Sequence, residues 1–300
     1  MSMMRFLLPA LALMLNALVF GVSWWPFRAL QEQGMHALWA TAFMFFLATG
    51  GLTLARPGAW RALARHPLLY VLLAASGLTN VGFNWAVTTG DVVRVVLLFY
   101  TMPAWALLLA WPLLGERPGA AALLRLALAL GGVVIVLKTP SSPWPLPDSL
   151  ADWLALAGGF CFALTNVLLR LLHATPNDAR MLAMFAGGAL MAASSALLGM
   201  KIGVVGAPPA HFGSWVAIAT ALGLALMAGN AALQYGAARL PAGTTALIML
   251  TEVVFASVSS VFLGAAELTA RSLAGGGLIV LAALLSVHSS ANAQRPVAQP

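Results

Sequence analysis

Charged residues are scarce in this sequence. Only 8% of its 300 residues are Asp, Glu, Lys or Arg, while 61% are hydrophobic. In a typical soluble domain about a quarter of the residues are charged, so these few charges cannot cover a water-exposed surface. The scarcity excludes an ordinary soluble protein and favours a chain that crosses a membrane several times.

The sequence also lacks the motifs that carry most enzyme chemistry. It has no His-x-x-x-His pair, no Gly-x-Ser-x-Gly elbow and no phosphate-binding loop of the Walker type. Cys161 is its only cysteine, which excludes an intrachain disulfide. We therefore expect no enzyme activity, no cofactor and no metal, and an integral-membrane enzyme is the weakest alternative.

The excess of basic residues does not indicate nucleic-acid binding. The formal net charge is +7, but Lys and Arg stand singly or in short clusters between apolar runs, without the basic stripe that nucleic acids need. Such clusters are typical of loops that face anionic lipid. The expected partners are membrane lipid and a small-molecule substrate, with no nucleic acid, and the chain is expected to act as a monomer.

Ten apolar runs make up most of the chain, separated by Gly, Pro and polar turn residues. A transmembrane helix needs about 20 mostly apolar residues, and each run approaches that length. The predicted spans are 6–27, 38–54, 68–87, 92–114, 120–136, 153–172, 181–198, 215–237, 242–263 and 273–287. They indicate an all-α integral membrane protein with ten transmembrane helices.

A proline-rich segment divides the ten spans into two sets of five. Residues 139–148 hold four prolines and follow the fifth span. We predict a first repeat at 1–140, a connection at 141–148, a second repeat at 149–288, and a polar, disordered tail at 289–300. Because five is odd, a second repeat must be inverted in the membrane relative to the first, and inverted repeats of this kind enclose a central cavity in secondary transporters.

The basic residues also predict the orientation in the membrane. With a cytoplasmic N-terminus, ten of the 15 Lys and Arg residues fall on cytoplasmic segments and five on outside ends. The positive-inside rule then places both termini in the cytoplasm.

Several residues recur after an interval of 150 positions. The matched pairs are Asn80 with Asn230, Asn84 with Gln234, Trp85 with Tyr235, and Thr101 with Thr251. A second anchor is Glu116, which follows the fourth span as Glu267 follows the ninth, at an interval of 151. Two anchors at nearly one interval support the prediction of an inverted repeat.

Glu252 lies near the middle of the ninth predicted span, where a charged side chain costs at least about 3 kcal/mol. Such a residue usually faces a cavity or a partner. Two roles remain open: contact with a substrate ammonium group or a transported proton, or a structural carboxyl that is neutral or paired with a neighbouring helix. The counterpart of Glu252 in the first half is Met102, so only one half carries the acid.

Amide side chains are the second polar signal. Asn80 and Asn84 lie one turn apart on the third span, as Asn230 and Gln234 do on the eighth. A buried amide needs hydrogen-bond partners or water, so these pairs favour a shared cavity, although amides also bond helices to one another. Two less marked candidates are Asn166 and Asn16.

Aromatic residues lie near these polar positions. Phe99 and Tyr100 precede Pro103, deeper than an interfacial belt explains, and a proline permits a bend beside a wet cavity. Phe83 precedes Asn84 directly. The rings that we expect to stack on a substrate are Trp24, Phe83, Phe99 and Tyr100.

Four short motifs carry a family resemblance. They are Leu-Gly-Glu at 114–116, the related segment at 263–267, Thr-Met-Pro at 101–103 and Thr-Glu-Val-Val at 251–254. With them the chain, over about residues 6–287, resembles the EamA-like branch of the drug/metabolite transporter superfamily. Val253 stands where that family usually has proline. Within the superfamily the chain looks most like the YddG-type exporters of aromatic amino acids.

The resemblance implies two inverted five-helix repeats that form a basket around a central cavity. It also implies export of aromatic amino acids, or of similar amphiphilic metabolites, across the bacterial inner membrane by alternating access. We expect Asn84, Asn230 and Gln234 to bind the polar atoms of the zwitterion, and Glu252 to bind the ammonium group or a proton. The alternative is a multidrug or lipophilic-cation exporter that uses Glu252.

Overall fold

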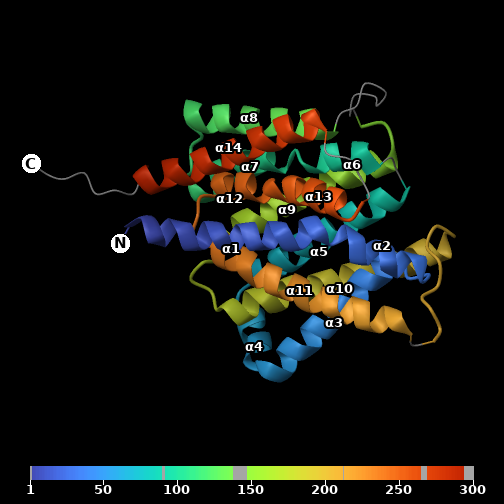
Figure 1. The fold of residues 1–300 in the computed structure, drawn as a ribbon. Helices are drawn as coiled ribbons and strands as arrows, with labels where there is room; N and C mark the ends of the chain where they lie inside the picture. Colours follow the sequence, from blue (N-terminus) through green and yellow to red (C-terminus); the bar gives the residue numbers. More distant parts are fainter. Residues whose placement is uncertain (1, 90–91, 138–146, 212, 265–268, 294–300) are drawn as a thin grey trace, which may run out of the picture.

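The computed structural model describes residues 2–89, 92–137, 147–211, 213–264 and 269–293, and every regular element in these ranges is an α-helix (Figure 1). A helix satisfies its backbone hydrogen bonds within one segment, as lipid requires. The helices are α1 (Ser2–Val22), α2 (Trp24–Glu32), α3 (Ala37–Ala55), α4 (Gly58–Arg65), α5 (Leu68–Thr89), α6 (Val92–Phe99), α7 (Met102–Leu114), α8 (Ala120–Leu137), α9 (Leu150–Leu171), α10 (Asn177–Lys201), α11 (Ser214–Ala237), α12 (Ala242–Met249), α13 (Thr251–Phe262) and α14 (Ala270–Ala293).

Among the described residues, eight helical stretches are long and apolar enough to cross a membrane. The fifth and tenth predicted spans form shorter apolar helices, Ala120–Val136 within α8 and Leu273–Ser289 within α14. Most of the predicted connection at 141–148 lies outside the described residues. α14 continues to Ala293, so the first residues of the predicted disordered tail are helical. α4 is a helix that the apolar pattern does not predict.

Three predicted spans are broken by a turn. The first divides between α1 and α2 at Ser23, whose hydroxyl donates a hydrogen bond to the Phe20 carbonyl at 2.6 Å. The fourth divides between α6 and α7, and the ninth between α12 and α13. At both of these breaks a threonine hydroxyl donates to the carbonyl three residues earlier at 2.7 Å, Thr101 to Leu98 and Thr251 to Ile248. The break between α12 and α13 therefore forms although position 253 is valine and not proline.

Several helices of the first half recur in the second half at an interval of about 150 positions. α6 covers 92–99 and α12 covers 242–249, 150 positions later, and α8 and α14 begin at Ala120 and Ala270. Packing partners correspond as well: α1 packs on α11 and α13, and α9 packs on α5 and α7. The interval of 150 residues thus extends from single side chains to whole helices.

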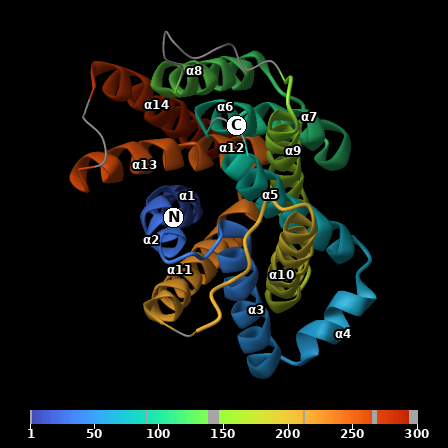
Figure 2. The ribbon, with the colours of Figure 1, turned by 90° about the vertical axis from the view of Figure 1, so that its right-hand side faces the viewer.

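Seen along the helices, α8 and α14 lie together on one side of the bundle, and α3, α4 and α10 lie on the opposite side (Figure 2). α8 and α14 meet at two glycines: a Cβ atom added to Gly132 would lie 2.6 Å from the Gly275 carbonyl oxygen. Small residues allow such a close approach of helices in lipid. α1, α5, α9, α11 and α12 lie between these outer groups and surround the candidate site.

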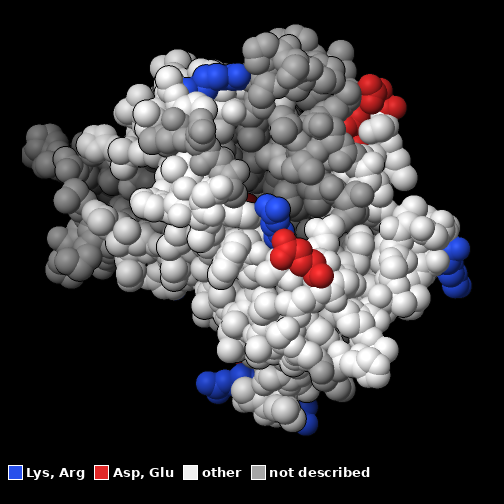
Figure 3. Space-filling model, turned by 45° about the vertical axis from the view of Figure 1, so that its right-hand side comes forward, with Lys and Arg blue, Asp and Glu red and all other residues white. Residues whose placement is uncertain are grey.

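The start of α1 and the end of α14 lie at one end of the bundle (Figure 1). We call this end the terminal face; α1 begins there, α14 ends there, and the turn from α11 to α12 lies there. Charged side chains are few and scattered over the surface seen in Figure 3, as expected for a surface that faces lipid.

Candidate transport site

A cavity opens between eight helices near the centre of the bundle. The space open to the centre of a water molecule is about 50 Å³, so the cavity is narrow in this conformation. Its wall combines three phenyl rings, three amides, three hydroxyl groups and one carboxyl with aliphatic and thioether side chains. The lining residues are Asn16, Phe20, Phe45, Ser76, Thr79, Asn80, Phe162, Thr165, Met184, Asn230, Leu233, Met249 and Glu252.

Glu252 reaches the cavity because the helix breaks before it. α12 ends at Met249 and α13 begins at Thr251, so Glu252 lies in the first turn of α13. The free N–H groups and the dipole of a helix N-terminus favour a negative charge there. Tyr100, at the matching break between α6 and α7, lies close enough to Glu252 for its hydroxyl and the carboxyl to interact. The two breaks therefore meet at the acid.

Three amides join Glu252 in the wall. The Asn80 side chain donates to the Ser76 carbonyl at 2.9 Å, and the Asn230 side chain donates to the Leu226 carbonyl at 3.0 Å. Each bond uses one of the two amide hydrogens. Asn16 is 1% exposed, and neither its amide nitrogen nor its oxygen has a partner among the described residues. A buried polar group of this kind is satisfied by water or ligand.

The predicted stacking rings occupy a second layer. Phe162 lines the cavity, and its ring centre lies 5.9 Å from that of Phe99. Phe99 contacts Phe83 at 4.8 Å and Tyr100 at 5.9 Å, both edge to face. Phe83, Phe99 and Tyr100 are not among the lining residues. They hold Phe162 in place, and the rings that face the cavity are Phe20, Phe45 and Phe162.

Four other predicted site residues lie away from the cavity wall. The Trp24 indole donates to the Ser259 hydroxyl at 2.9 Å and lines a separate hollow at Arg28 and Glu32. The Asn84 amide donates to the Thr41 hydroxyl at 2.8 Å and links α5 to α3. Two further amides, which have no partner among the described residues, are buried between helices: Asn166 and Gln234.

Helical spacing could have found several lining residues that the sequence analysis missed. Phe20 lies one turn after Asn16, and Ser76 lies one turn before Asn80. Asn16 itself precedes Asn166 by 150 positions, the interval that relates the other pairs. Phe45 and Met184 carry no such signal, since no polar residue stands one turn away from either at a position paired across the halves.

The chemistry of the wall is acidic and amphiphilic. Glu252 is the single charged residue among the described residues that line the cavity, with no Lys or Arg beside it. No group of three His, Cys, Asp or Glu side chains in the described part of the chain is arranged to hold a metal ion. Such a wall offers stacking surface, hydrogen bonds and one site for a cation.

Comparison with known proteins agrees with the membrane fold. One solved crystal structure superposes with a TM-score of 0.74 at 18% sequence identity, covering 96% of this chain and 99% of the other. An uncharacterized transporter of Pseudomonas aeruginosa is 35% identical over 113 residues. This match covers 36% of the present chain and 37% of the relative, so the chain spans little more than a third of the curated relative's length.

A family model for EamA-like transporters matches the chain twice, at residues 7–138 and at residues 149–288. Together with the apolar helices, this match defines the class, a multi-pass membrane protein of a family of transporters. The chain belongs to the EamA-like transporter family of the drug/metabolite transporter superfamily.

Proposed function

We propose that the protein is a secondary transporter that exports aromatic amino acids, or similar amphiphilic amines, across a bacterial inner membrane by alternating access. The observation that carries the proposal is the wall of the central cavity, which combines three phenyl rings with three amides and Glu252. A ring would stack on Phe20, Phe45 or Phe162. The ammonium group would bind Glu252, and amide hydrogens would bind the carboxylate.

The proposed architecture is ten transmembrane helices in two inverted five-helix repeats. It is supported by the interval of 150 residues between corresponding helices and by the two separate family matches. With five helices in each half, the repeats must have opposite orientations in the membrane. The distribution of Arg and Lys supports a cytoplasmic terminal face.

A lipophilic cation is the second candidate substrate. It is favoured by the absence of Lys and Arg from the described cavity wall, because a substrate carboxylate then has only amide partners. An organic cation with aromatic rings would need only Glu252 and the phenyl rings.

Flux into proteoliposomes separates these candidates. We would compare phenylalanine, tryptophan, phenethylamine, N-acetylphenylalanine and tetraphenylphosphonium, each against vesicles without protein. The proposal predicts saturable flux of phenylalanine and tryptophan, weaker flux of phenethylamine, and none of N-acetylphenylalanine, which lacks the ammonium group. Flux of tetraphenylphosphonium alone would replace amino-acid export by cation export, and no flux of any solute would contradict both.

A further inference from the structure

We propose that Asn166, Gln234 and Thr245 form a second polar site that binds the solute's headgroup. In this conformation a set of ionic contacts at the terminal face, called the latch, keeps this second site closed. The latch consists of Glu116, Arg170 and the backbone groups of Ala238 and Ala242. The inference rests on the proposed transport function and extends the solute's path beyond the cavity.

Three helices connect the cavity to the latch, and the same three kinds of residue follow one another along each of them. In each, a cavity residue is followed one turn along by a buried polar residue, and one turn further by a latch residue. The series are Phe162, Asn166 and Arg170 on α9; Asn230, Gln234 and Ala238 on α11 and its C-terminal end; and Met249, Thr245 and Ala242 on α12. α9, α11 and α12 also contact one another, so the three middle residues lie at one depth.

The middle residues are buried polar groups without partners. Asn166 is 1% exposed, Gln234 3% and Thr245 0%. The two amides and the Thr245 hydroxyl have no hydrogen-bond partner among the described residues. Buried polar groups are almost always paired, and three unpaired ones at one depth indicate a place that binds water or solute in another conformation.

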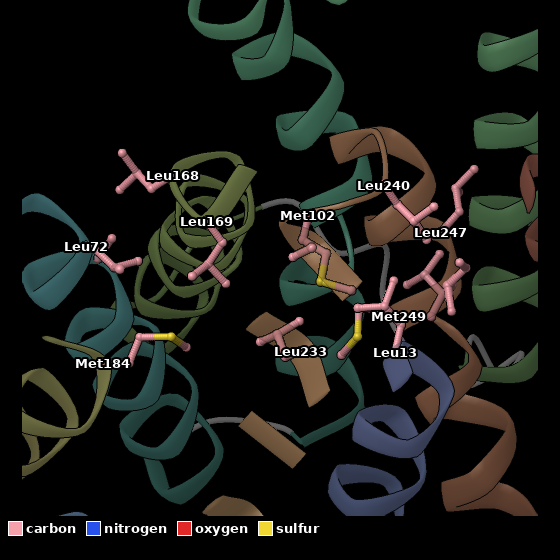
Figure 4. Packing of buried hydrophobic residues seen from close by; sticks show 14 of the residues in the cluster. Leu13, Leu72, Met102, Leu168, Leu169, Met184, Leu233, Leu240, Leu247 and Met249 are labelled. Atoms are coloured by element: carbon pink, nitrogen blue, oxygen red, sulfur yellow. The ribbon is translucent and has the colours of Figure 1, made fainter. Parts of the chain in front are cut away.

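An apolar floor separates the second polar site from the cavity. Leu233 and Met249 line the cavity and also belong to the buried cluster that contains Met102 and Leu247 (Figure 4). Leu233, Met249 and Met102 come from α11, α12 and α7 and belong to one buried cluster (Figure 4). A solute that passes toward the terminal face must displace this floor and then meets the amides.

The latch joins the ends of four helices. Arg170 Nε lies 3.7 Å from Glu116 Oε1, and Arg170 Nη1 donates to the Ala238 carbonyl at 3.1 Å. The Ala242 N–H donates to Glu116 Oε2 at 3.1 Å. The two charged side chains are only 28% and 29% exposed. The ends of α7, α9 and α11 are thereby tied to the start of α12.

The latch also accounts for the Leu-Gly-Glu motif at 114–116, which the cavity does not use. Gly115 has a φ of 71°, and it ends α7 in the left-handed conformation that glycine adopts without strain. This turn directs Glu116 to the unpaired N–H groups at the start of α12. Opening the terminal face requires these contacts to break, because they bridge the helices that must separate.

The chemistry of the second polar site fits a zwitterionic headgroup. Two amides and one hydroxyl provide donors for a carboxylate and acceptors for an ammonium group, and they add no net charge. Glu252 would hold the ammonium group at the cavity level, and the neutral inner groups would take it over as the floor opens.

Thiol labelling tests the proposal without relying on transport. Cys161 is the only cysteine, so a Cys161→Ser background carries a single reporter, Thr245→Cys, with Gln234→Cys as a second reporter on another helix. A membrane-impermeant maleimide is applied from the terminal face. Arg170→Gln should speed labelling of each reporter about tenfold, as expected when charge-assisted contacts that hold one state are lost.

The matched control is Arg28→Gln, which removes an exposed ion pair of 3.4 Å between Arg28 and Glu32 and should leave the labelling rate unchanged.

Phenylalanine and tetraphenylphosphonium are then added as probes of occupancy. Slower labelling with either probe is expected if the second polar site binds the solute. Labelling that Arg170→Gln leaves unchanged at both reporters, or labelling that neither probe slows, would overturn the inference. If phenylalanine is transported but neither Arg170→Gln nor a probe changes the labelling rate, the second polar site is refuted and the proposed transport function stands. If Arg170→Gln speeds labelling and only tetraphenylphosphonium slows it, amino-acid export is refuted and the second polar site stands.

Discussion

Two pairs of positions related by 150 residues have opposite roles in the two halves of the chain, whereas Asn80 and Asn230 line the cavity together. Phe20 lines the open cavity, while its counterpart Arg170 belongs to the latch. Asn16 lines the cavity, while Asn166 is buried without a partner below it. In the proposed inverted repeat, matching residues lie toward opposite faces, so one set surrounds the open side and the other the closed side. The comparison indicates a conformation that is closed at the terminal face.

Substitution of Glu252 and of its counterpart Met102 should give the largest difference in transport rate between the two halves. Glu252 lines the cavity, and its counterpart Met102 is buried in the apolar cluster. Glu252→Gln removes a charged hydrogen-bond acceptor for the substrate ammonium, so phenylalanine flux should fall about a hundredfold. Met102→Leu conserves volume and should keep flux within about twofold. Initial rates in proteoliposomes check both, and undiminished flux in Glu252→Gln would make the acid structural.

The amide pair Asn16 and Asn166 gives the next difference. Asn16→Ala removes a hydrogen-bonding group from the cavity, so KM for phenylalanine added from the open side should rise about fivefold. Asn166→Ala should change this KM less than about twofold, because Asn166 lies below the floor. The KM values are measured with solute supplied from that side only. Equal increases in the two variants would contradict the difference in depth.

The two helix breaks should respond alike. Thr101→Val and Thr251→Val each remove one hydroxyl bond of 2.7 Å to a backbone carbonyl. Each should lower the free energy of unfolding by about 1 kcal/mol, equivalent to a fall of about 2 °C in Tm for a chain of this size. Thermal unfolding in detergent measures this shift. A loss confined to one variant would show that the breaks differ in structural weight.

The smallest effect is expected at the exposed pair Arg28 and Glu32. Its side chains are 66% and 69% exposed, and such pairs on a helix contribute about 0.3–0.5 kcal/mol. Arg28→Gln should therefore shift Tm by less than about 1 °C in the same unfolding experiment. A larger destabilisation than that of Thr101→Val would show that the hollow around Trp24 supports the fold.

The sequence predicts the helices better than the site. Apolar runs locate the spans because lipid tolerates little else, but the turns within them depend on local bonds such as those of Thr101 and Thr251. Glu252, Asn80 and Asn230 line one cavity, and their binding of substrate stays a prediction. The other residues expected at the site lie away from this wall in this conformation, and their roles stay predictions: Trp24, Phe83, Asn84, Phe99, Tyr100, Asn166 and Gln234.

The reason is rotation about each helix axis, which the sequence does not specify in apolar helices. Phe83 and Phe162 are equally hydrophobic, yet only Phe162 faces the cavity. Gln234 lies one turn from Asn230 on the same face but beyond the floor formed by Leu233. Depth along a helix decides which member of an amide pair is open in a given conformation, and no residue pattern encodes that choice.

Equilibrium binding of radiolabelled phenylalanine to the purified protein tests the central claim, that the cavity at Glu252 holds the substrate. The account predicts saturable binding at one site, competition by tryptophan, and at least about tenfold weaker binding in Glu252→Gln. Saturable binding of equal strength in wild type and Glu252→Gln would contradict it.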